Sequence, residues 1–436
     1  MELLDLWETL QPSCYLDAAL DLCRKEEASY YIEADAKPPS AVQEAVVAGR
    51  CLQKTRQRLF FYVRAVQNGL VDESPRRFFL KVLLTGVGDD ELSMHKDIVH
   101  RTFGATPHII KTLQTKVLRV DPFEMSYILM ECNVSLQAQL DLVLRRSRDT
   151  EEFNFVLLSC FFQCFHGIAT LHTLGYQHRD MRLENITSSY FSRTGELHYT
   201  VENLHLVVPV AHRDYVLKVA IIDFGLSERW CADTCVNGVE EFLSPNYVFI
   251  TENEMEMSFS TADDTFGLGL SLLAALHVFV LPKLDASIVR VTESLFSRQI
   301  ESATTGRHRE HLSMRNAKRL TEHAFVLVLL LGLPSLEEFP AFHYSPVGTY
   351  FSTCVAGYLR QLSEYNFLAT QFTDPTHHLY DAFNLLRKAL RWHRHDRIAA
   401  KQMLLQPEFT TRFARPRDID ACSNHRHYVW QEAGEI

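Results

Sequence analysis

The stretch LHTLGYQHRDMRLENI, residues 171–186, and the shorter AIIDFGLSE, residues 220–228, decide how the rest of the chain is interpreted. The first stretch contains Asp180 and Asn185, and the second contains Asp223 behind a run of apolar residues. Carboxylate and amide oxygens are hard ligands of the kind that Mg²⁺ prefers. A further carboxylate beside an attacking hydroxyl can accept its proton. The two stretches therefore offer two oxygen ligands suited to Mg²⁺ and one carboxylate suited to accept a proton.

The surroundings of these stretches strengthen the prediction. Apolar residues recur at helical spacing from Phe153 to Leu174, so a long helix is expected to lead into the H-R-D tripeptide. The residues IIDFG that follow are strand-like. The alternative interpretation is an unrelated loop with a solvated Arg-Asp pair, but it does not explain an Asn at the right offset between a helix and a strand.

These two stretches resemble the H-R-D and D-F-G motifs of the protein kinase superfamily. In that family the H-R-D Asp accepts the proton of the substrate hydroxyl, and the Asn and the D-F-G Asp bind Mg²⁺. The resemblance implies that Asp180 is catalytic and that Asn185 and Asp223 bind the metal. Arg182 stands for the usual Lys, so it is implied to offset charge on the transferred phosphate. The implied cofactors are ATP and Mg²⁺, and the implied fold is α+β, with a small β-rich N-lobe and a large helical C-lobe.

Upstream, FFLK at residues 78–81 stands where the family has its V-A-I-K strand. The resemblance implies that Lys81 binds the α- and β-phosphates of ATP. Glu91, on the helix expected to follow, is its implied partner, and Asp97 is the second choice. An acid on a solvated helix face is the alternative interpretation of Glu91.

The segment YILMECN, residues 127–133, resembles the hinge that binds adenine in this family. Met130 is then the gatekeeper, and the backbone of Glu131 and Asn133 is implied to face the base. Outside the kinase frame the same segment is an ordinary buried strand.

Downstream, GVEEFLSPN at 238–246 is similar to the family's G-T-x-x-Y-x-A-P-E pattern. DDTFGLGLSLL resembles the opening of its central helix, which implies that Asp264 braces the catalytic loop. HRHDRIAAKQMLLQPEF at 393–409 resembles the closing motif, with Arg397 as the matching arginine. The resemblance extends from Val42 to Phe409 and so covers nearly the whole chain.

The domain boundaries follow from this alignment and from the apolar periodicity. Three antiparallel strands are expected between Val42 and Leu84 (VVAGRCL, RLFFYVRAV and RRFFLKVLL), then a helix in DDELSMHKDIVHR and strands around Ile109 and at YILME. Further helices are expected at about 264–280, 318–333 and 379–405. The predicted parts are a helical N-terminal extension 1–41, a kinase domain 42–409 (N-lobe about 42–131, C-lobe about 134–409, inserts near 190–215 and 282–325) and a C-terminal tail 410–436.

The chain departs from the family pattern at several positions. Gln53, Thr55 and Arg58 stand at the three glycine positions of the loop that covers the phosphates. Phe79 stands for the small Ala that lies against adenine, so it either crowds the base or stacks on it. Asn246 replaces the Glu that pairs with the closing arginine, and we expect a nearby carboxylate or backbone carbonyl to replace it.

These matches and departures are consistent with two functions. The first is an ATP- and Mg²⁺-dependent kinase that phosphorylates serine or threonine on a protein substrate. Arg182 favours Ser/Thr over tyrosine specificity, although Val239 stands where most Ser/Thr kinases have a Thr. The alternative is a pseudokinase scaffold that binds partners through its N-terminal helix and inserts. Retention of Lys81, Asp180, Asn185 and Asp223 together favours the enzyme.

Composition narrows the partners and the compartment. The net charge of −10 argues against nucleic acid or an acidic membrane surface as a partner of the whole domain. The ten scattered cysteines fit a reducing cytoplasmic or nuclear compartment. No export signal is recognised at MELLDLWETLQ, and the apolar run Phe266–Leu281 is shorter than a membrane span. The degenerate glycine loop and large inserts are similar to kinases of large DNA viruses, which would place the protein inside a host cell. The oligomeric state is left open.

Three further groups of residues are interpreted conservatively. Cys160, Cys164 and His166 fall at helical spacing and are predicted to be core residues rather than metal ligands. Cys422, His425 and His427 lack a fourth ligand at zinc-finger spacing. Thr234 is either an ordinary exposed residue or a phosphorylation site whose phosphate is bound by Arg179.

Overall fold

The structure is a computed structural model, and its fold divides into two compact units. The first unit comprises Met1–Arg101 and Ile109–Val134, and the second comprises Thr102–His108 and Ser135–Ile436. The structure describes residues 29–32, 58–67, 70–71, 78–84, 88–120, 123–131, 133–146, 150–189, 195–212, 215–229, 260–276, 373–391, 394–415 and 427–429.

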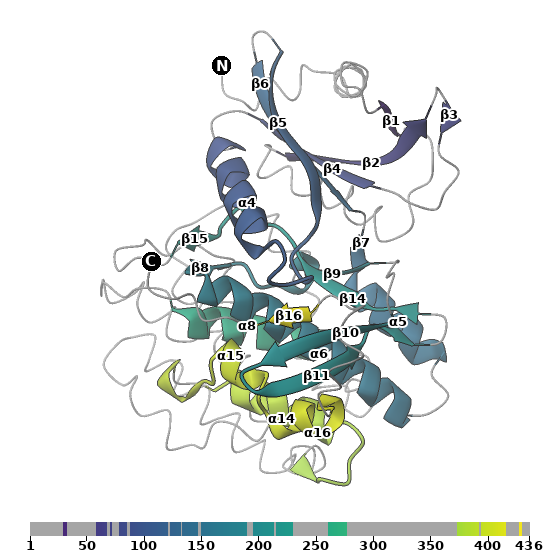
Figure 1. The fold of residues 1–436 in the computed structure, drawn as a ribbon, viewed down its shortest axis with the longest axis vertical. Coiled ribbons are helices and arrows are strands. Elements are labelled where there is room, and N and C mark those ends of the chain that lie inside the picture. Colours follow the sequence, from purple (N-terminus) through teal and green to yellow (C-terminus); the bar gives the residue numbers. More distant parts are fainter. Residues whose placement is uncertain are drawn as a thin grey trace, which may run out of the picture. The chain divides into compact units, whose positions relative to one another are not determined.

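The first unit is built on an antiparallel sheet with the strand order β1-β2-β4-β6-β5, and the short β3 pairs with β2 (Figure 1). In β4 the side chains of Lys81 and Leu83 are buried, and because they are two residues apart they lie on the same face of the strand. The strands are β1 (Ser29–Ile32), β2 (Arg58–Gln67), β3 (Leu70–Val71), β4 (Phe78–Leu84), β5 (Thr112–Val120) and β6 (Phe123–Glu131).

One helix, α4 (Gly88–Thr102), follows β4 in the first unit. Its buried residues Leu92, His95 and Ile98 recur at helical spacing. The Nε2 atom of His95 lies 2.7 Å from the hydroxyl oxygen of Thr112, which ties the helix to β5. The predicted helix at DDELSMHKDIVHR is confirmed.

The strands predicted at RLFFYVRAV, RRFFLKVLL and YILME are confirmed. One other prediction for this unit is wrong, and one further strand is shifted along the chain. Ser29–Ile32 is a strand paired with β2, although residues 1–41 were expected to be helical. Its sequence SYYI suits a strand, because aromatic and β-branched side chains fit a pleated surface. The strand expected around Ile109 begins at Thr112 instead. The predicted strand VVAGRCL lies outside the described residues.

The second unit is organised around α6 (Thr150–Thr173), which is buried almost along its whole length. Among the described residues, the stretch Glu151–Thr173 is long and apolar enough to cross a membrane, but 89% of its most apolar window is buried inside the protein. That burial is what a core helix of a folded domain shows. The helices that pack on α6 are α5 (Leu136–Arg146), α8 (Thr261–Ala275), α14 (Tyr380–Ala389), α15 (Ala400–Met403) and α16 (Pro407–Phe413).

One helix prediction for the second unit needs correction. The single helix expected at 379–405 is divided into α14 and α15, with a 3₁₀ turn at Arg394–Asp396 between them. The interruption lets Arg397 turn inward, where its side chain is buried. The helix expected at 264–280 is present as α8, and the one at 318–333 lies outside the described residues.

The insert predicted near 190–215 is a packed β-hairpin. Its strands β10 (Glu196–Val201) and β11 (Leu204–Pro209) are antiparallel, and Glu202 in the turn has a φ of 53°. The predicted tail takes part as well, because β16 (His427–Val429) pairs in parallel with β10 (Figure 1). The described residues of the insert and of the tail are therefore structured parts of the second unit.

The hairpin is anchored in the core by Tyr199, whose side chain is fully buried. His108 is also buried, and its Nδ1–H donates to the carbonyl oxygen of Val219 at 2.8 Å. Its Nε2 therefore accepts from the hydroxyl of Tyr199, at 2.6 Å. Burial, with a smaller effect of His166, lowers the pKa of His108 well below its ordinary value, so the ring stays neutral.

The contacts of His108 also account for a shift in the boundary between the two units. Residues Thr102–His108 were expected in the N-lobe, but they belong to the second unit. The backbone oxygen of His108 also accepts from the amide of Ile221 at 2.8 Å. A Cβ atom at Gly167 would lie 2.8 Å from the Cδ1 atom of Ile221, so only glycine lets α6 approach these residues closely.

Arg397 has two acceptors that replace the Glu expected at position 246, as predicted. Its Nη1 lies 3.0 Å from Oδ1 of Asp263, and its Nε donates to the carbonyl oxygen of Arg391 at 2.7 Å. Arg394 approaches the other oxygen of Asp263 at 2.7 Å. Burial lowers the pKa of Arg397 to about 10, so it is still charged at neutral pH. Asn246 lies outside the described residues.

We predict that Tyr199→Phe lowers the free energy of unfolding by about 1–3 kcal/mol, because the buried Nε2 of His108 loses its hydrogen-bond donor. Chemical denaturation measures the change. Tyr380→Phe is the matched control, since Tyr380 is half-buried and its hydroxyl has no hydrogen bond to the part of the chain that the structure describes. Equal stability of the two variants would contradict the anchoring role of Tyr199.

Candidate active site

The loop that carries H-R-D begins where α6 ends. Gly175 has a φ of 80° and turns the chain into β8 (Tyr176–Gln177), after which come His178, Arg179 and Asp180. Arg179 has a φ of 67°, in the left-handed region that residues with a Cβ atom seldom adopt. Such a conformation persists only when surrounding contacts impose it.

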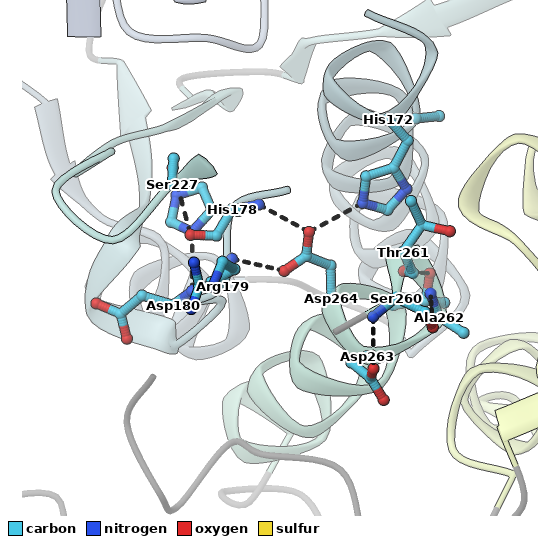
Figure 2. Close-up of polar contacts among 12 residues, drawn as sticks. His172, His178, Arg179, Asp180, Ser227, Ser260, Thr261, Ala262, Asp263 and Asp264 are labelled. Carbon is cyan, nitrogen blue, oxygen red and sulfur yellow. Dashed lines mark hydrogen bonds and ion pairs between the residues drawn. The ribbon is translucent and has the colours of Figure 1, made fainter. Parts of the chain in front are cut away.

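Asp264 supplies those contacts (Figure 2). The backbone amide of His178 donates to its Oδ2 at 2.8 Å, and the amide of Arg179 donates to its Oδ1 at 2.7 Å. The Nε2 atom of His172, near the end of α6, lies 3.0 Å from Oδ2. The expectation that Asp264 braces this loop is confirmed.

The first turn of α8 fixes Asp264 in place. Ser260 caps this helix, because its Oγ accepts from the amide of Ala262 at 3.2 Å. The amide of Ser260 in turn donates to Oδ2 of Asp263 at 2.9 Å, which completes a capping box (Figure 2). Burial by itself raises the pKa of Asp264, but hydrogen bonds and charge from His172, with smaller effects of His178, lower it overall. Asp264 is therefore a carboxylate at neutral pH.

Asp180 is 5% exposed and has one oxygen bound and one free. Its Oδ2 accepts from Nδ2 of Asn185 at 2.9 Å, and Nε of Arg182 is 3.5 Å from the same oxygen. Its Oδ1 is buried and has no hydrogen-bond partner among the described residues. In Figure 2 the carboxylate of Asp180 points away from Asp264. A buried acceptor without a donor is costly, so this oxygen is suited to receive one from a ligand.

The environment makes Asp180 more basic than an ordinary aspartate. Burial is the largest cause of its raised pKa, and the negative charge of Asp223 acts in the same direction. The charge of Arg182 opposes the rise, as do His178 and the hydrogen bond from Asn185. A buried carboxylate with a raised pKa is a typical proton acceptor.

Asp223 is held beside this loop by two antiparallel strands, β9 (Ile186–Ser189) and β14 (Lys218–Ile221). The amide of Ile222 donates to the backbone oxygen of Asn185 at 3.0 Å. Asp223 itself has a φ of 64°, again in the left-handed region. The next residue, Phe224, is buried with its ring 5.4 Å from that of His178.

The residues present fit a magnesium ion. Both hydrogen bonds from Asn185 to Asp180 use the amide nitrogen, so the amide oxygen is not committed to Asp180. That oxygen and the Asp223 carboxylate are hard donors, and Mg²⁺ is usually held by one or two protein groups together with water and substrate phosphates. Within the described ranges no group of three or more His, Cys, Asp or Glu residues could hold a metal. A site completed by phosphate needs no such group.

In the first unit, Lys81 and Glu91 form a buried ion pair between β4 and α4. The pairing predicted from the sequence is therefore confirmed. The second choice, Asp97, instead accepts from Nε of Arg101 at 2.9 Å on the helix surface. What Lys81 binds beyond Glu91 stays a prediction.

The proposed hinge residues lie at the end of β6. Met130 is buried and is paired in register with Phe79, which is half-buried. The amide of Glu131 donates to the carbonyl oxygen of Lys111 at 3.0 Å, so that amide is not a donor for a base. Asn133 begins β7 (Asn133–Ser135). Their contact with adenine stays a prediction.

Cys160, Cys164 and His166 are fully buried along α6, which confirms their interpretation as core residues. Burial raises the pKa of Cys160 to about 12 and lowers that of His166 to about 3, so neither is charged at neutral pH. Arg58 is the first residue of β2. The other singled-out positions, Gln53, Thr55, Thr234, Val239, Cys422 and His425, lie outside the described residues.

Sequence reasoning missed two residues that help to build the site. His172 lies in the last turn of α6 and reaches Asp264, and Glu228 pairs with Arg179. The spacing of His172 on the helix was visible, but its partner is far away in the chain. Nothing in the local sequence marks Glu228, because its partner is defined by the tertiary fold.

Comparison with known proteins gives a distant likeness to solved structures. No protein-family model matches the chain, and no curated protein matches it. Among solved structures the chain is similar to the MAP kinase LmaMPK10 from Leishmania major, at 16% sequence identity and a TM-score of 0.45. The alignment covers 96% of this chain and 93% of that chain. A likeness this distant assigns neither fold nor function, so the assignment depends on the residues described above.

Proposed function

We propose that the chain is a protein kinase that transfers the γ-phosphate of ATP to serine or threonine of another protein. The observation that carries the proposal is the carboxylate of Asp180, with Oδ2 fixed by Asn185 and the buried Oδ1 without a hydrogen-bond partner among the described residues. A substrate hydroxyl bound to Oδ1 satisfies the carboxylate and places its own oxygen for attack.

Strain around the same group supports a catalytic role over a structural one. Arg179 and Asp223, which lie on either side of the site, both have left-handed backbone angles. Each costs of order 1–3 kcal/mol, a cost that usually appears at functional sites. A loop that served only the fold could adopt relaxed angles at both positions.

The remaining residues have distinct tasks in the proposed reaction. Asp180 orients the hydroxyl and accepts its proton, while Arg182 opposes the charge that gathers on the transferred phosphate. The oxygens of Asn185 and Asp223 hold Mg²⁺, which when bound neutralises the phosphate charge. Lys81, oriented by Glu91, binds the α- and β-phosphates. The reaction requires these groups to act on one nucleotide, and that requirement is open to test.

The proposed substrate specificity and compartment depend on the sequence alone. Arg182 beside Asp180 favours Ser/Thr over tyrosine substrates. The protein is proposed to act in the cytoplasm or nucleus, of a host cell if its origin is viral. A pseudokinase scaffold is the second candidate. The half-buried Phe79 opposite Met130 favours it, because a ring at this position narrows the space that adenine needs.

We predict that Asp180→Asn lowers phosphate transfer by about 10²–10⁴-fold, because the proton acceptor is lost. Lys81→Met is expected to lower transfer strongly as well. Labelled ATP, Mg²⁺ and a generic protein substrate provide the assay. Asp97→Asn and Lys96→Met, on the surface of α4, are the matched controls and should keep full activity. Equal transfer by all five proteins, wild type included, would refute the proposal.

We predict that ATP with Mg²⁺ raises the melting temperature of the wild-type protein, since a ligand that binds only the folded state stabilises it. Chelation of the metal should reduce the shift, and Lys81→Met should reduce it further. A normal shift without phosphate transfer would support the scaffold. Phe79→Ala is expected to increase the shift if the ring crowds adenine, and to reduce it if the ring stacks on the base.

We predict that the acid limb of the kcat profile lies above the ordinary aspartate pKa of about 3.9, because the pKa of Asp180 is raised and only the carboxylate accepts a proton. Arg182→Met should move the limb to higher pH, since the charge of Arg182 lowers the pKa of Asp180. Arg182→Lys keeps a cation and is the control. A limb at the same pH in wild type and Arg182→Met would show that another group titrates.

A further inference from the structure

The residue before Asp180 is held by an acid that the chain itself supplies. The guanidinium group of Arg179 forms an ion pair with the carboxylate of Glu228. Only 3% of the Arg179 side chain is exposed, compared with 40% of the Glu228 side chain. The pair therefore joins a buried cation to a partly exposed anion.

Backbone pairing on the strand that carries Glu228 places it beside Arg179. Strand β15 (Glu228–Arg229) is antiparallel to β8, with Glu228 opposite Gln177 and Arg229 opposite Tyr176. The guanidinium of Arg229 lies 5.7 Å from the centre of the Tyr176 ring. These contacts hold Glu228 in register with the start of the H-R-D loop.

Ser227 adds a further connection to this loop, because its hydroxyl donates to the backbone oxygen of His178 at 3.3 Å (Figure 2). Two contacts of Arg179 help to fix it beside this loop. Its amide donates to Asp264, and its guanidinium binds Glu228. Both contacts act on a residue with a φ of 67°, whose backbone leads directly into Asp180.

Burial of the Arg179 guanidinium makes the loss of its ion pair costly in free energy. A buried guanidinium that loses a carboxylate partner keeps its charge and must either find another acceptor or move toward water. Movement of Arg179 displaces the peptide that it shares with Asp180. The acid partner of Arg179 therefore affects the position of the proposed proton acceptor without contacting substrate.

We propose that Glu228 is a positioning residue that holds Asp180 in its active geometry, so that transfer does not require a phosphate added to Thr234 or elsewhere in the segment after Glu228. The proposal rests on the proposed kinase function. Because the chain provides the anion that a phosphorylated residue would otherwise bring to Arg179, the site is complete as the protein is synthesised.

The test compares Glu228→Gln, which keeps the shape but removes the charge, with Glu228→Asp, which keeps the charge. We expect kcat to fall about 10- to 100-fold in Glu228→Gln, as small displacements of a catalytic group can do, with little change in the KM for ATP. Glu228→Asp should recover part of the loss. Glu202→Gln, in the exposed turn of the hairpin, is the control and should behave as wild type.

A second arm examines phosphorylation. Wild-type protein treated with phosphatase, and Thr234→Ala, are both expected to keep full activity. The proposal is overturned if Glu228→Gln is as active as wild type, or if phosphatase treatment abolishes wild-type activity. The latter result would assign the anchoring of Arg179 to a phosphate.

Hydrogen exchange gives a readout that does not depend on catalysis. Amides of residues 176–181 should exchange faster in Glu228→Gln than in wild type, while the global melting temperature stays close to that of Glu202→Gln. Unchanged exchange overturns the proposal. If wild type transfers no phosphate, the proposed function fails, and the exchange rates still decide whether Glu228 positions the loop.

Discussion

The carboxylate of Asp264 is the contact on which the rest of the second unit's site depends. It is buried, ionised and bound by the amides of His178 and Arg179, and His172 approaches it from α6. One charged group thereby joins two core helices to a loop that has no regular hydrogen bonding of its own. A carboxylate accepts from both backbone amides at once, and its charge makes these hydrogen bonds stronger than those to a neutral acceptor, which helps to hold the unfavourable backbone angle of Arg179.

Within this unit, similar aspartate side chains have different surroundings, and the surroundings give them different pKa values. Asp264 accepts several donors and has a lowered pKa, whereas Asp180 has a raised pKa and a buried oxygen without a donor among the described residues. Asp263, adjacent in sequence, is used differently again and pairs with Arg394 and Arg397. Of three buried aspartates in one unit, Asp264 thus braces a loop, Asp263 pairs with arginine and Asp180 is the proposed base, and their surroundings distinguish them.

The hairpin β10–β11 shows how an insert becomes part of the core. Tyr199 binds His108, and His108 binds the backbone of β14 at Val219 and Ile221, shortly before Asp223. A segment that the alignment treats as additional therefore supports the strand that leads to a proposed metal ligand. Its parallel pairing with β16 also gives the end of the chain a structural role.

The sequence by itself determined the residues with fixed local meaning: the H-R-D and D-F-G motifs, the pairing of Lys81 with Glu91, the bracing role of Asp264 and the need of Arg397 for a substitute acceptor. The roles of Lys81, Glu91 and Asp264 followed from the resemblance of their motifs to a known family, and the need of Arg397 for an acceptor followed from the cost of burying a charge. Only the tertiary structure decided that Ser29–Ile32 is a strand, that Thr102–His108 belongs to the second unit, and that Glu228 meets Arg179. Each of these depends on a partner distant in the chain, and local propensity contains no information about such a partner.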